Sequence, residues 1–92
     1  MKIEEGQDRY FVYNDSGQEI GEITYSHPYK DVLSIDHTYV DPAFRGHHLA
    51  GKLLQAVVDK AVKEHKKIIP ACSYAKIQFE RKKEYQDIQY FE

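Results

Sequence analysis

The sequence predicts one domain of the α/β (α+β) class, in which strands come first and helices follow. Two patterns indicate this: residues 10–40 form aromatic, β-branched or alternating apolar runs, whereas the apolar residues of 49–65 recur every three or four positions. The 92 residues suffice for one hydrophobic core, so we expect a single domain over 1–92. With 41% hydrophobic and 30% charged residues, the composition excludes a disordered or collagen-like chain.

The first half of the chain is predicted to form three strands. Each is a run rich in β-branched, aromatic or alternating apolar residues that ends at turn-forming residues. The predicted strands cover residues 10–13, 19–25 and 32–40, with interruptions at 14–17 and 27–31. If the third strand alternates regularly, it places Leu33, Ile35, His37 and Tyr39 on one face.

The second half begins with a long amphipathic helix over 49–65, the clearest element in the sequence. A short apolar strand is expected over 67–72, with a proline near its end. Ser73 is expected to cap a second helix that carries the apolar residues of 74–79. Residues 84–92 are aromatic but aperiodic, so no element is predicted there.

The junction between the third strand and the long helix is a candidate anion site. A turn with proline and glycine leads directly into the helix, so the first free N–H groups of the helix point into the turn. Arg45, His47 and His48 add side-chain donors beside these groups. The alternative is an ordinary helix start with an exposed arginine and two solvated histidines.

Residues 40–54 also carry a recognisable pattern, Val40-x-Pro42-x-x-Arg45-Gly46-x-x-Leu49-Ala50-x-x-Leu53-Leu54. This pattern resembles the acyl-CoA signature of the GNAT superfamily of N-acetyltransferases, and residues 8–88 resemble its short, single-domain subgroup. The resemblance implies a mixed, mostly antiparallel sheet of about 4–5 strands packed against a long central helix and a shorter second helix. It further implies acetyl-CoA or coenzyme A as a cosubstrate.

The resemblance also assigns residues to the cosubstrate. Val40 would contact the pantetheine arm and the thioester, and the pyrophosphate loop would consist of Arg45, Gly46, His47, His48, Leu49 and Ala50. His48 stands where the usual loop has a second glycine, which restricts the approach of phosphate if the position needs a positive φ. The basic run within 76–83 suits a solvated helix face, and in this fold it could meet the 3′-phosphate.

Cys72, His37 and Tyr74 are the candidate catalytic residues. Larger family members often carry a tyrosine acid on the second helix, but that position falls on Phe79 here, so Tyr74, Tyr85 or Cys72 would have to protonate the leaving thiolate. Cys72 could equally be a nucleophile or a small buried hydrophobe. His37 suits the acceptance of a proton from an attacking ammonium, and it could equally be a structural histidine.

The resemblance implies an acyl-CoA-dependent N-acetyltransferase, in which a primary amine attacks the thioester directly. A non-catalytic or weakly active coenzyme A or acyl-CoA binding module is the alternative, and a protein-interaction element is a third possibility. The short chain leaves little room for an acceptor pocket, so we expect an open site for a small molecule, a protein lysine or an N-terminus. We expect a monomer or a weak homodimer.

Charge and composition argue against several other classes of partner. The net charge is −2, with −6 over residues 1–44 and +4 over 45–92, and a near-neutral whole argues against nucleic acid as a partner. The single cysteine and the absence of an i, i+4 histidine pair argue against a disulfide and a metal site. No signal segment and no run of roughly 20 apolar residues is present, so we expect a cytoplasmic protein without a membrane partner.

Overall fold

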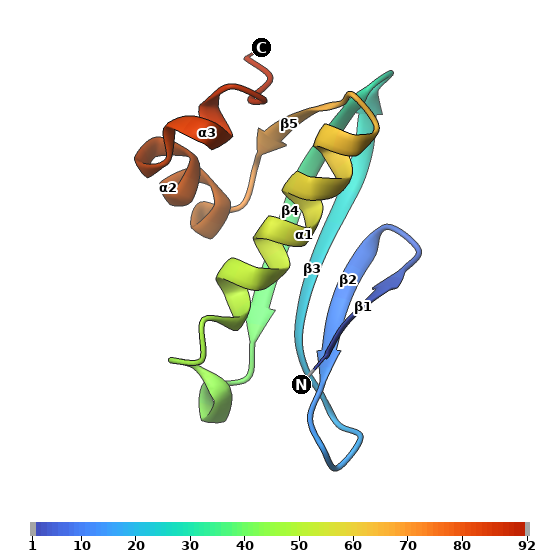
Figure 1. Cartoon of the computed structure of the whole chain (residues 1–92), viewed down its shortest axis with the longest axis vertical. Coiled ribbons are helices and arrows are strands. Elements are labelled where there is room, and N and C mark those ends of the chain that lie inside the picture. The colour runs from blue at the N-terminus through green and yellow to red at the C-terminus, as the bar shows by residue number, and fades with distance from the viewer. Residues whose placement is uncertain (1, 92) are drawn as a thin grey trace.

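Five strands in the order β1-β2-β3-β4-β5 form one sheet (Figure 1). The structure is a computed structural model that describes residues 2–91, so Met1 and Glu92, the ends of the predicted 1–92 domain, lie outside the described residues. The first four strands are antiparallel neighbours, and β5 pairs with β4 in parallel. The strands are β1 (Lys2–Gly6), β2 (Arg9–Tyr13), β3 (Glu19–Tyr29), β4 (Val32–Val40) and β5 (Lys67–Pro70). The predicted mixed, mostly antiparallel sheet is confirmed.

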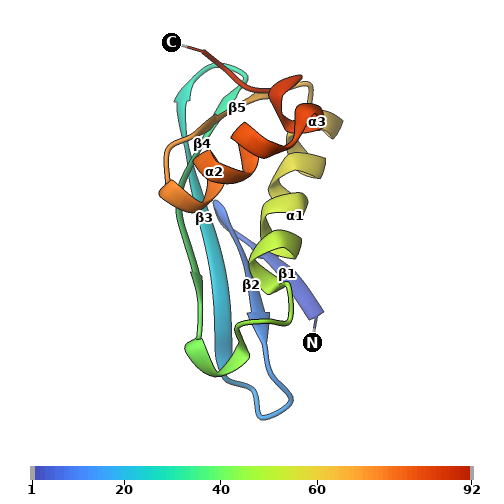
Figure 2. The same ribbon diagram turned by 90° about the vertical axis from the view of Figure 1, so that its left-hand side faces the viewer.

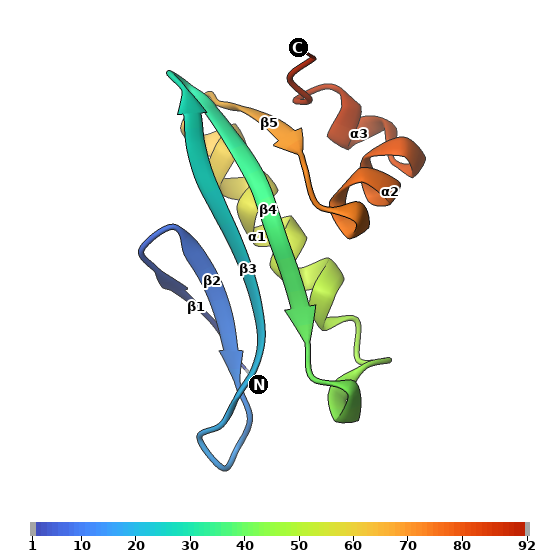
Figure 3. The ribbon, with the colours of Figure 1, turned by 180° about the vertical axis from the view of Figure 1, so that it is seen from behind.

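Helix α1 (Leu49–Lys63) crosses one face of the sheet and carries much of the core. Figure 2 shows α1 on one side of β3 and β4, and Figure 3 shows these strands from the other side, where no helix of residues 2–91 lies over them. The buried face of α1 has the predicted spacing of three and four residues, as in Leu53, Leu54, Val57 and Ala61. Fully burying one such large apolar side chain stabilises the fold by about 1.5–3 kcal/mol.

The second helix, α2 (Ser73–Arg81), begins one residue earlier than the sequence suggests. Its N-cap is Cys72 rather than Ser73, because the sulfur of Cys72 accepts a hydrogen bond from the Ala75 N–H at 3.4 Å. A short helix, α3 (Lys83–Gln86), follows directly and packs its Tyr85 ring against Phe79 with the ring centroids 5.1 Å apart. The two helices lie beside β5, beyond the edge of the sheet (Figure 3).

Strand β4 contains a bulge that overturns the predicted alternation of its side chains. Thr24 pairs with His37, but the next residue, Tyr25, pairs with Ile35, so Asp36 is an extra residue in β4. Ile35 and Val40 therefore both join the core, although strict alternation would place them on opposite faces.

The prediction of one face shared by Leu33, Ile35, His37 and Tyr39 is therefore wrong. Leu33 and Ile35 are fully buried, whereas His37 is exposed and Tyr39 keeps 46% of its surface accessible. Beyond the bulge, the core side belongs to Thr38 and Val40 instead. This change matters for function because it decides which side chains of β4 face the groove described below.

Three segments differ from the sequence-based expectation in extent. The N-terminal residues form β1 without an alternating apolar pattern, because its main chain pairs with β2 along its whole length. Strand β3 continues through Pro28 to Tyr29, with an irregular register after Ser26. The aperiodic tail lies along β5, where Ile68 donates to the Ile88 carbonyl and Tyr90 donates to the Ile68 carbonyl, both at 2.8 Å.

Candidate active site

Strands β4 and β5 run together only as far as Ile35 and then separate. The last paired residues are Ile35 and Pro70, and the Ile35 carbonyl accepts hydrogen bonds from the N–H groups of both Ala71 (3.1 Å) and Cys72 (2.9 Å). Residues 36–40 of β4 therefore have β3 on one side and, among the described residues, no strand on the other. The separation opens a gap between β4 and the start of α2.

The gap exposes main-chain groups of β4 that a further strand would otherwise bind. The Asp41 N–H donates to the Ile20 carbonyl at 2.7 Å, which fixes the alternation of the β3–β4 ladder. In an antiparallel ladder, alternate residues bond to the same neighbour, so Tyr39 and His37 bond to β3. The N–H and carbonyl groups of Thr38 and Val40 therefore point into the gap.

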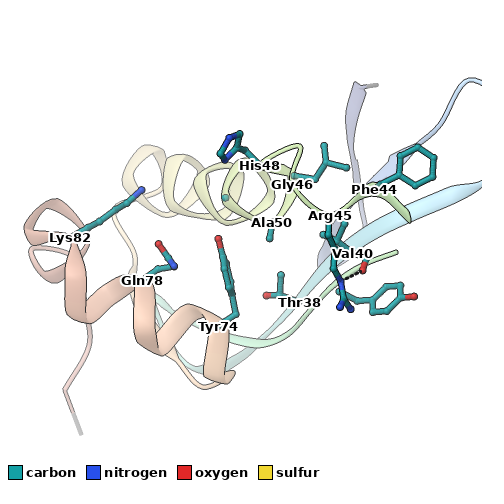
Figure 4. A pocket seen from close by; sticks show the side chains of 13 residues that line it. Thr38, Val40, Phe44, Arg45, Gly46, His48, Ala50, Tyr74, Gln78 and Lys82 are labelled. Carbon is teal, nitrogen blue, oxygen red and sulfur yellow. Dashed lines mark hydrogen bonds between the residues drawn. The ribbon is translucent and has the colours of Figure 1, made fainter. Parts of the chain in front are cut away.

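One of these carbonyls is already in use within the chain. Arg45 Nε donates a hydrogen bond to the Val40 carbonyl oxygen at 3.2 Å. The guanidinium of the exposed Arg45 thus lies beside the outer end of β4 (Figure 4).

A groove of about 510 Å³ runs between the outer end of β4, the first turn of α1 and one side of α2 (Figure 4). Its cationic side chains are Arg45 and Lys82, and its histidine is His48. Among the described residues that line it there is no carboxylate. The lining consists of Thr38, Tyr39, Val40, Phe44, Arg45, Gly46, His48, Leu49, Ala50, Gly51, Tyr74, Gln78 and Lys82. The charge of this groove suits an anionic ligand.

The N-terminus of α1 opens into the same groove. Its N-cap is His48, and no side-chain hydrogen bond caps the helix within the part of the chain that the structure describes. The first intrahelical bond runs from the Lys52 N–H to the His48 carbonyl, at 3.1 Å. The N–H groups of residues 49–51 are therefore left without a helical partner and carry the positive end of the helix dipole.

The backbone of the loop before α1 is left-handed at two positions. Gly46 has a φ of 95°, which a glycine adopts without strain. His48 has a φ of 58°, so the position of the missing glycine does require a positive φ, and a side chain occupies it at a cost in backbone free energy. The short 3₁₀ helix Pro42–Phe44 precedes this loop and positions Phe44, whose ring lies 6.4 Å from that of His47.

The structure brings together most of the residues that the sequence assigns to the cosubstrate. Six of them line the groove, namely Val40, Arg45, Gly46, His48, Leu49 and Ala50. His47 is not part of that lining. The groove residues that sequence reasoning missed are Thr38 and Gln78 above all. Alternation groups Thr38 with Val40 but does not show which face of the strand meets the groove, whereas Gln78 lies one helical turn after Tyr74 and follows from the period of α2.

The three candidate catalytic residues do not lie together. Tyr74 lines the groove, and burial raises the pKa of its hydroxyl above the ordinary tyrosine value. Cys72 is half-buried at the start of α2, where its sulfur accepts from the Ala75 N–H and contacts the Thr38 hydroxyl oxygen at 3.4 Å. His37 is exposed and, as a strand neighbour of Thr38, faces the side of the sheet away from the groove.

Tyr85, the remaining candidate acid, lies elsewhere. Its hydroxyl donates to the Gln55 side-chain oxygen at 2.7 Å, and burial raises its pKa. It lines a separate depression between α1 and α3. Residues 2–91 contain no helix long and apolar enough to cross a membrane and no group of three His, Cys, Asp or Glu side chains arranged around a metal position.

Comparison with known proteins places this geometry among acetyltransferases. The sequence profile of the GCN5-related N-acetyl-transferase family matches residues 9–88. The NMR structure of a GCN5-like candidate N-acetyltransferase from Staphylococcus aureus superimposes with a TM-score of 0.81 at 35% identity, over 97% of this chain and 87% of that one. No curated protein sequence matches the chain significantly.

Larger proteins share the fold over part of their length. An acetyltransferase from Bacillus cereus matches with a TM-score of 0.60 and 27% identity, over 72% of this chain and 46% of its own. A chain of the NatC complex, solved with a Gag peptide and CoA, matches with a TM-score of 0.55 and 32% identity, over 65% of this chain and 43% of that one. The present chain thus covers less than half the length of these two larger proteins.

Proposed function

The chain belongs to the GCN5-related N-acetyltransferase family, and we propose that it moves an acetyl group from acetyl-CoA to a primary amine. One observation carries the proposal. The free main-chain groups of Thr38 and Val40 line a groove that ends at the uncapped N-terminus of α1. A ligand with amide groups at one end and phosphates at the other matches this order of donors and acceptors.

The residues around the groove support a binding mode for coenzyme A. The free N–H groups at the start of α1, together with Arg45 and His48, would hold the pyrophosphate. The amides of the pantetheine arm would pair with Thr38 and Val40, in the way a neighbouring strand would. The Val40 carbonyl now accepts a hydrogen bond from Arg45. When the ligand binds, a pantetheine amide would take the place of Arg45 at this carbonyl, and the guanidinium would be free to bind the phosphates. Lys82, the C-cap residue of α2, lies at the far side of the groove and suits the 3′-phosphate.

The transfer itself needs few protein groups. The nitrogen of a neutral amine attacks the thioester carbonyl carbon, the new C–N bond forms, and the C–S bond breaks. A free main-chain N–H of β4 near Val40, that of Thr38, would stabilise the negative charge that develops on the carbonyl oxygen. Tyr74 would give its proton to the departing thiolate, and the proton lost by the amine would pass to His37 or to water.

Tyr74 is the better candidate for the acid than Cys72. Tyr74 lines the groove, and its hydroxyl has a proton to give at neutral pH, since its pKa is raised by burial above the ordinary value of 10.0. The sulfur of Cys72 caps α2 and contacts Thr38, which favours a structural role. We expect Tyr74→Phe to lower kcat by about 100-fold, the lower end of what a general acid contributes. A larger loss of kcat in Cys72→Ala than in Tyr74→Phe would reverse this assignment.

The acceptor amine would approach from the uncovered face of the sheet. His37 and Tyr39 are exposed there, and in the described part of the chain no helix covers them (Figure 3). Such an open surface suits an amine on a protein or a flexible polyamine better than a small molecule that needs an enclosed pocket. The single-domain, monomeric or weakly dimeric state and the cytoplasmic location stay predictions.

The first experiment is a titration with coenzyme A and acetyl-CoA, followed by amide NMR shifts. We expect saturable shifts over residues 40–50 and around Cys72. Arg45→Ala should weaken binding about tenfold, the loss of one charge-assisted contact to phosphate. Lys30→Ala is the matched control, because Lys30 is an exposed cation at the opposite end of β4. An absence of binding at millimolar ligand would overturn the proposal, and binding without turnover over a panel of amines would leave the chain as a coenzyme A binding module.

A further inference from the structure

The side chains of Thr38 and Cys72 meet across the gap between β4 and α2. The Thr38 hydroxyl oxygen lies 3.4 Å from the Cys72 sulfur. The contact lies next to the point where the strands part, since the Ile35 carbonyl still accepts from the Cys72 N–H at 2.9 Å. The two side chains thus bridge the inner end of the gap.

Both partners are held by the fold rather than by each other alone. Thr38 is in β4 beyond the bulge, and its main chain pairs in register with Ile23 of β3. Cys72 is fixed by its N–H bond to Ile35 and by the bond from the Ala75 N–H to its sulfur at 3.4 Å. Neither side chain can withdraw without disturbing a strand or the start of α2. The bridge is therefore stiff.

The bridge lies at the end of the groove opposite the phosphate loop. From Val40 beside that loop, β4 runs back two residues to Thr38, about 7 Å at ~3.3–3.4 Å per residue, and the contact with Cys72 extends from there. With phosphates at the loop and the pantetheine arm along Thr38 and Val40, the acyl group is the part of the ligand nearest to the bridge. This step rests on the proposed function.

We propose that the Thr38–Cys72 bridge limits the acyl group to a short chain, so that acetyl is accepted and butyryl is excluded. An added methylene normally gains about 0.8 kcal/mol when it is buried, but only where space exists. Here the additional carbons would have to push apart a contact held by a strand and a helix start, and such overpacking typically costs about 1–3 kcal/mol. Thr38 and Cys72 are thus specificity-determining residues.

The test compares the affinities of coenzyme A, acetyl-CoA and butyryl-CoA by calorimetry in wild type and in Thr38 variants. Thr38→Ala removes one side of the bridge, and Thr38→Val is the matched control because it keeps the volume and loses only the hydroxyl. We expect wild type to bind acetyl-CoA at least about tenfold more tightly than butyryl-CoA. Thr38→Ala should reduce this ratio by about tenfold, whereas Thr38→Val should leave it within about twofold.

The outcomes separate this inference from the proposed function. If none of the three ligands binds to wild type, the proposed function itself fails. If coenzyme A binds but wild type does not discriminate between acetyl and butyryl, or Thr38→Ala keeps the wild-type ratio, the acyl-length inference is overturned and the proposed function stands. Should Thr38→Ala not fold, Cys72→Ala removes the other side of the bridge, and it should shift the ratio in the same direction.

Discussion

The two halves of strand β4 have different neighbours and different burial. Residues 32–35 lie between β3 and β5, and Leu33 and Ile35 within them are fully buried. Residues 37–40 pair with β3 alone, and Tyr39 keeps 46% of its surface accessible. One half is core, and the other lines the groove.

The difference arises from where β5 ends. Pro70 is the last residue of β5, and the chain turns at once into Cys72 and α2. The outer half of β4 is therefore left with main-chain groups that have no strand to bind. A binding site for an amide-containing ligand can thus arise from a missing neighbour, without any special side chain. The following predictions test whether the inner half serves stability and the outer half serves binding.

The largest effect is expected for Leu33→Ala in the inner half. Leu33 is fully buried in the core cluster, so the truncation should lower the free energy of unfolding by about 2–5 kcal/mol, measured by urea denaturation. Ile35→Val is the milder companion, with an expected loss of about 0.5–1.5 kcal/mol. Thr38→Ala in the outer half should cost less than Leu33→Ala, and an equal cost would remove the distinction between the two halves.

The sequence predicts the helix start and the loop before it, but not the difference between the two halves of β4. The period of three and four residues predicts α1 and its buried face, and the residue pattern of 40–54 predicts six of the groove residues. The helix start and its loop are local features, so local sequence specifies them. The predicted fold class is correct for the same reason.

The features that define the outer half of β4 are not local. No local sequence pattern marks Asp36 as the bulge residue, because the bulge is defined only by the pairing of β4 with β3. Regular alternation groups His37 with Leu33 and Ile35, and the bulge separates it from these two buried residues. Ser73 was the expected cap because serine caps helices more often than cysteine, yet the backbone turn places the sulfur of Cys72 at the Ala75 N–H.

A proline scan of the outer half is expected to have the next largest effect. Tyr39→Pro removes an N–H that bonds to β3 and leaves a carbonyl of β3 unpaired, whereas Val40→Pro removes an N–H that points into the groove. Tyr39→Pro should therefore lose about 1–3 kcal/mol more unfolding free energy than Val40→Pro, by urea denaturation. Val40→Pro should lose the greater share of acetyl-CoA affinity, by calorimetry. Equal loss of affinity in both would contradict the assignment of the groove-facing groups.

Alkaline pH should weaken the fold through its buried tyrosines, an effect absent at neutral pH. Burial raises the pKa of Tyr25 above the ordinary value of 10.0, and the same cause acts on Tyr74 in the groove. Above pH 10 the unfolded chain gives up protons that the folded chain keeps, so stability is fully present below pH 10 and falls as the pH rises through the higher folded values.

Urea denaturation from pH 8 to pH 11 measures this loss. Tyr25→Phe and Tyr74→Phe should each flatten the decline above pH 10, because each removes one group that titrates differently in the two states. Bound coenzyme A should increase the loss of stability above pH 10 that is due to Tyr74, because a ligand in the groove buries this side chain further. It should not change the loss that is due to Tyr25, which lies in the core. An equal ligand effect in both variants would show that the groove is not where the ligand lies.

The smallest effect is expected for His48→Gly, at the loop that follows the outer half of β4. Glycine adopts the left-handed backbone of this position without the clash of a Cβ, so the free energy of unfolding should rise by up to about 1 kcal/mol. The phosphates should also approach the loop amides more closely, which should tighten coenzyme A binding by about threefold to tenfold, measured by calorimetry. His47→Ala is the control, because His47 is outside the groove lining. If His48→Gly instead weakens binding while it stabilises the fold, the imidazole itself contacts the phosphates, and this chain has replaced a backbone contact by a side chain at the cost of a strained residue.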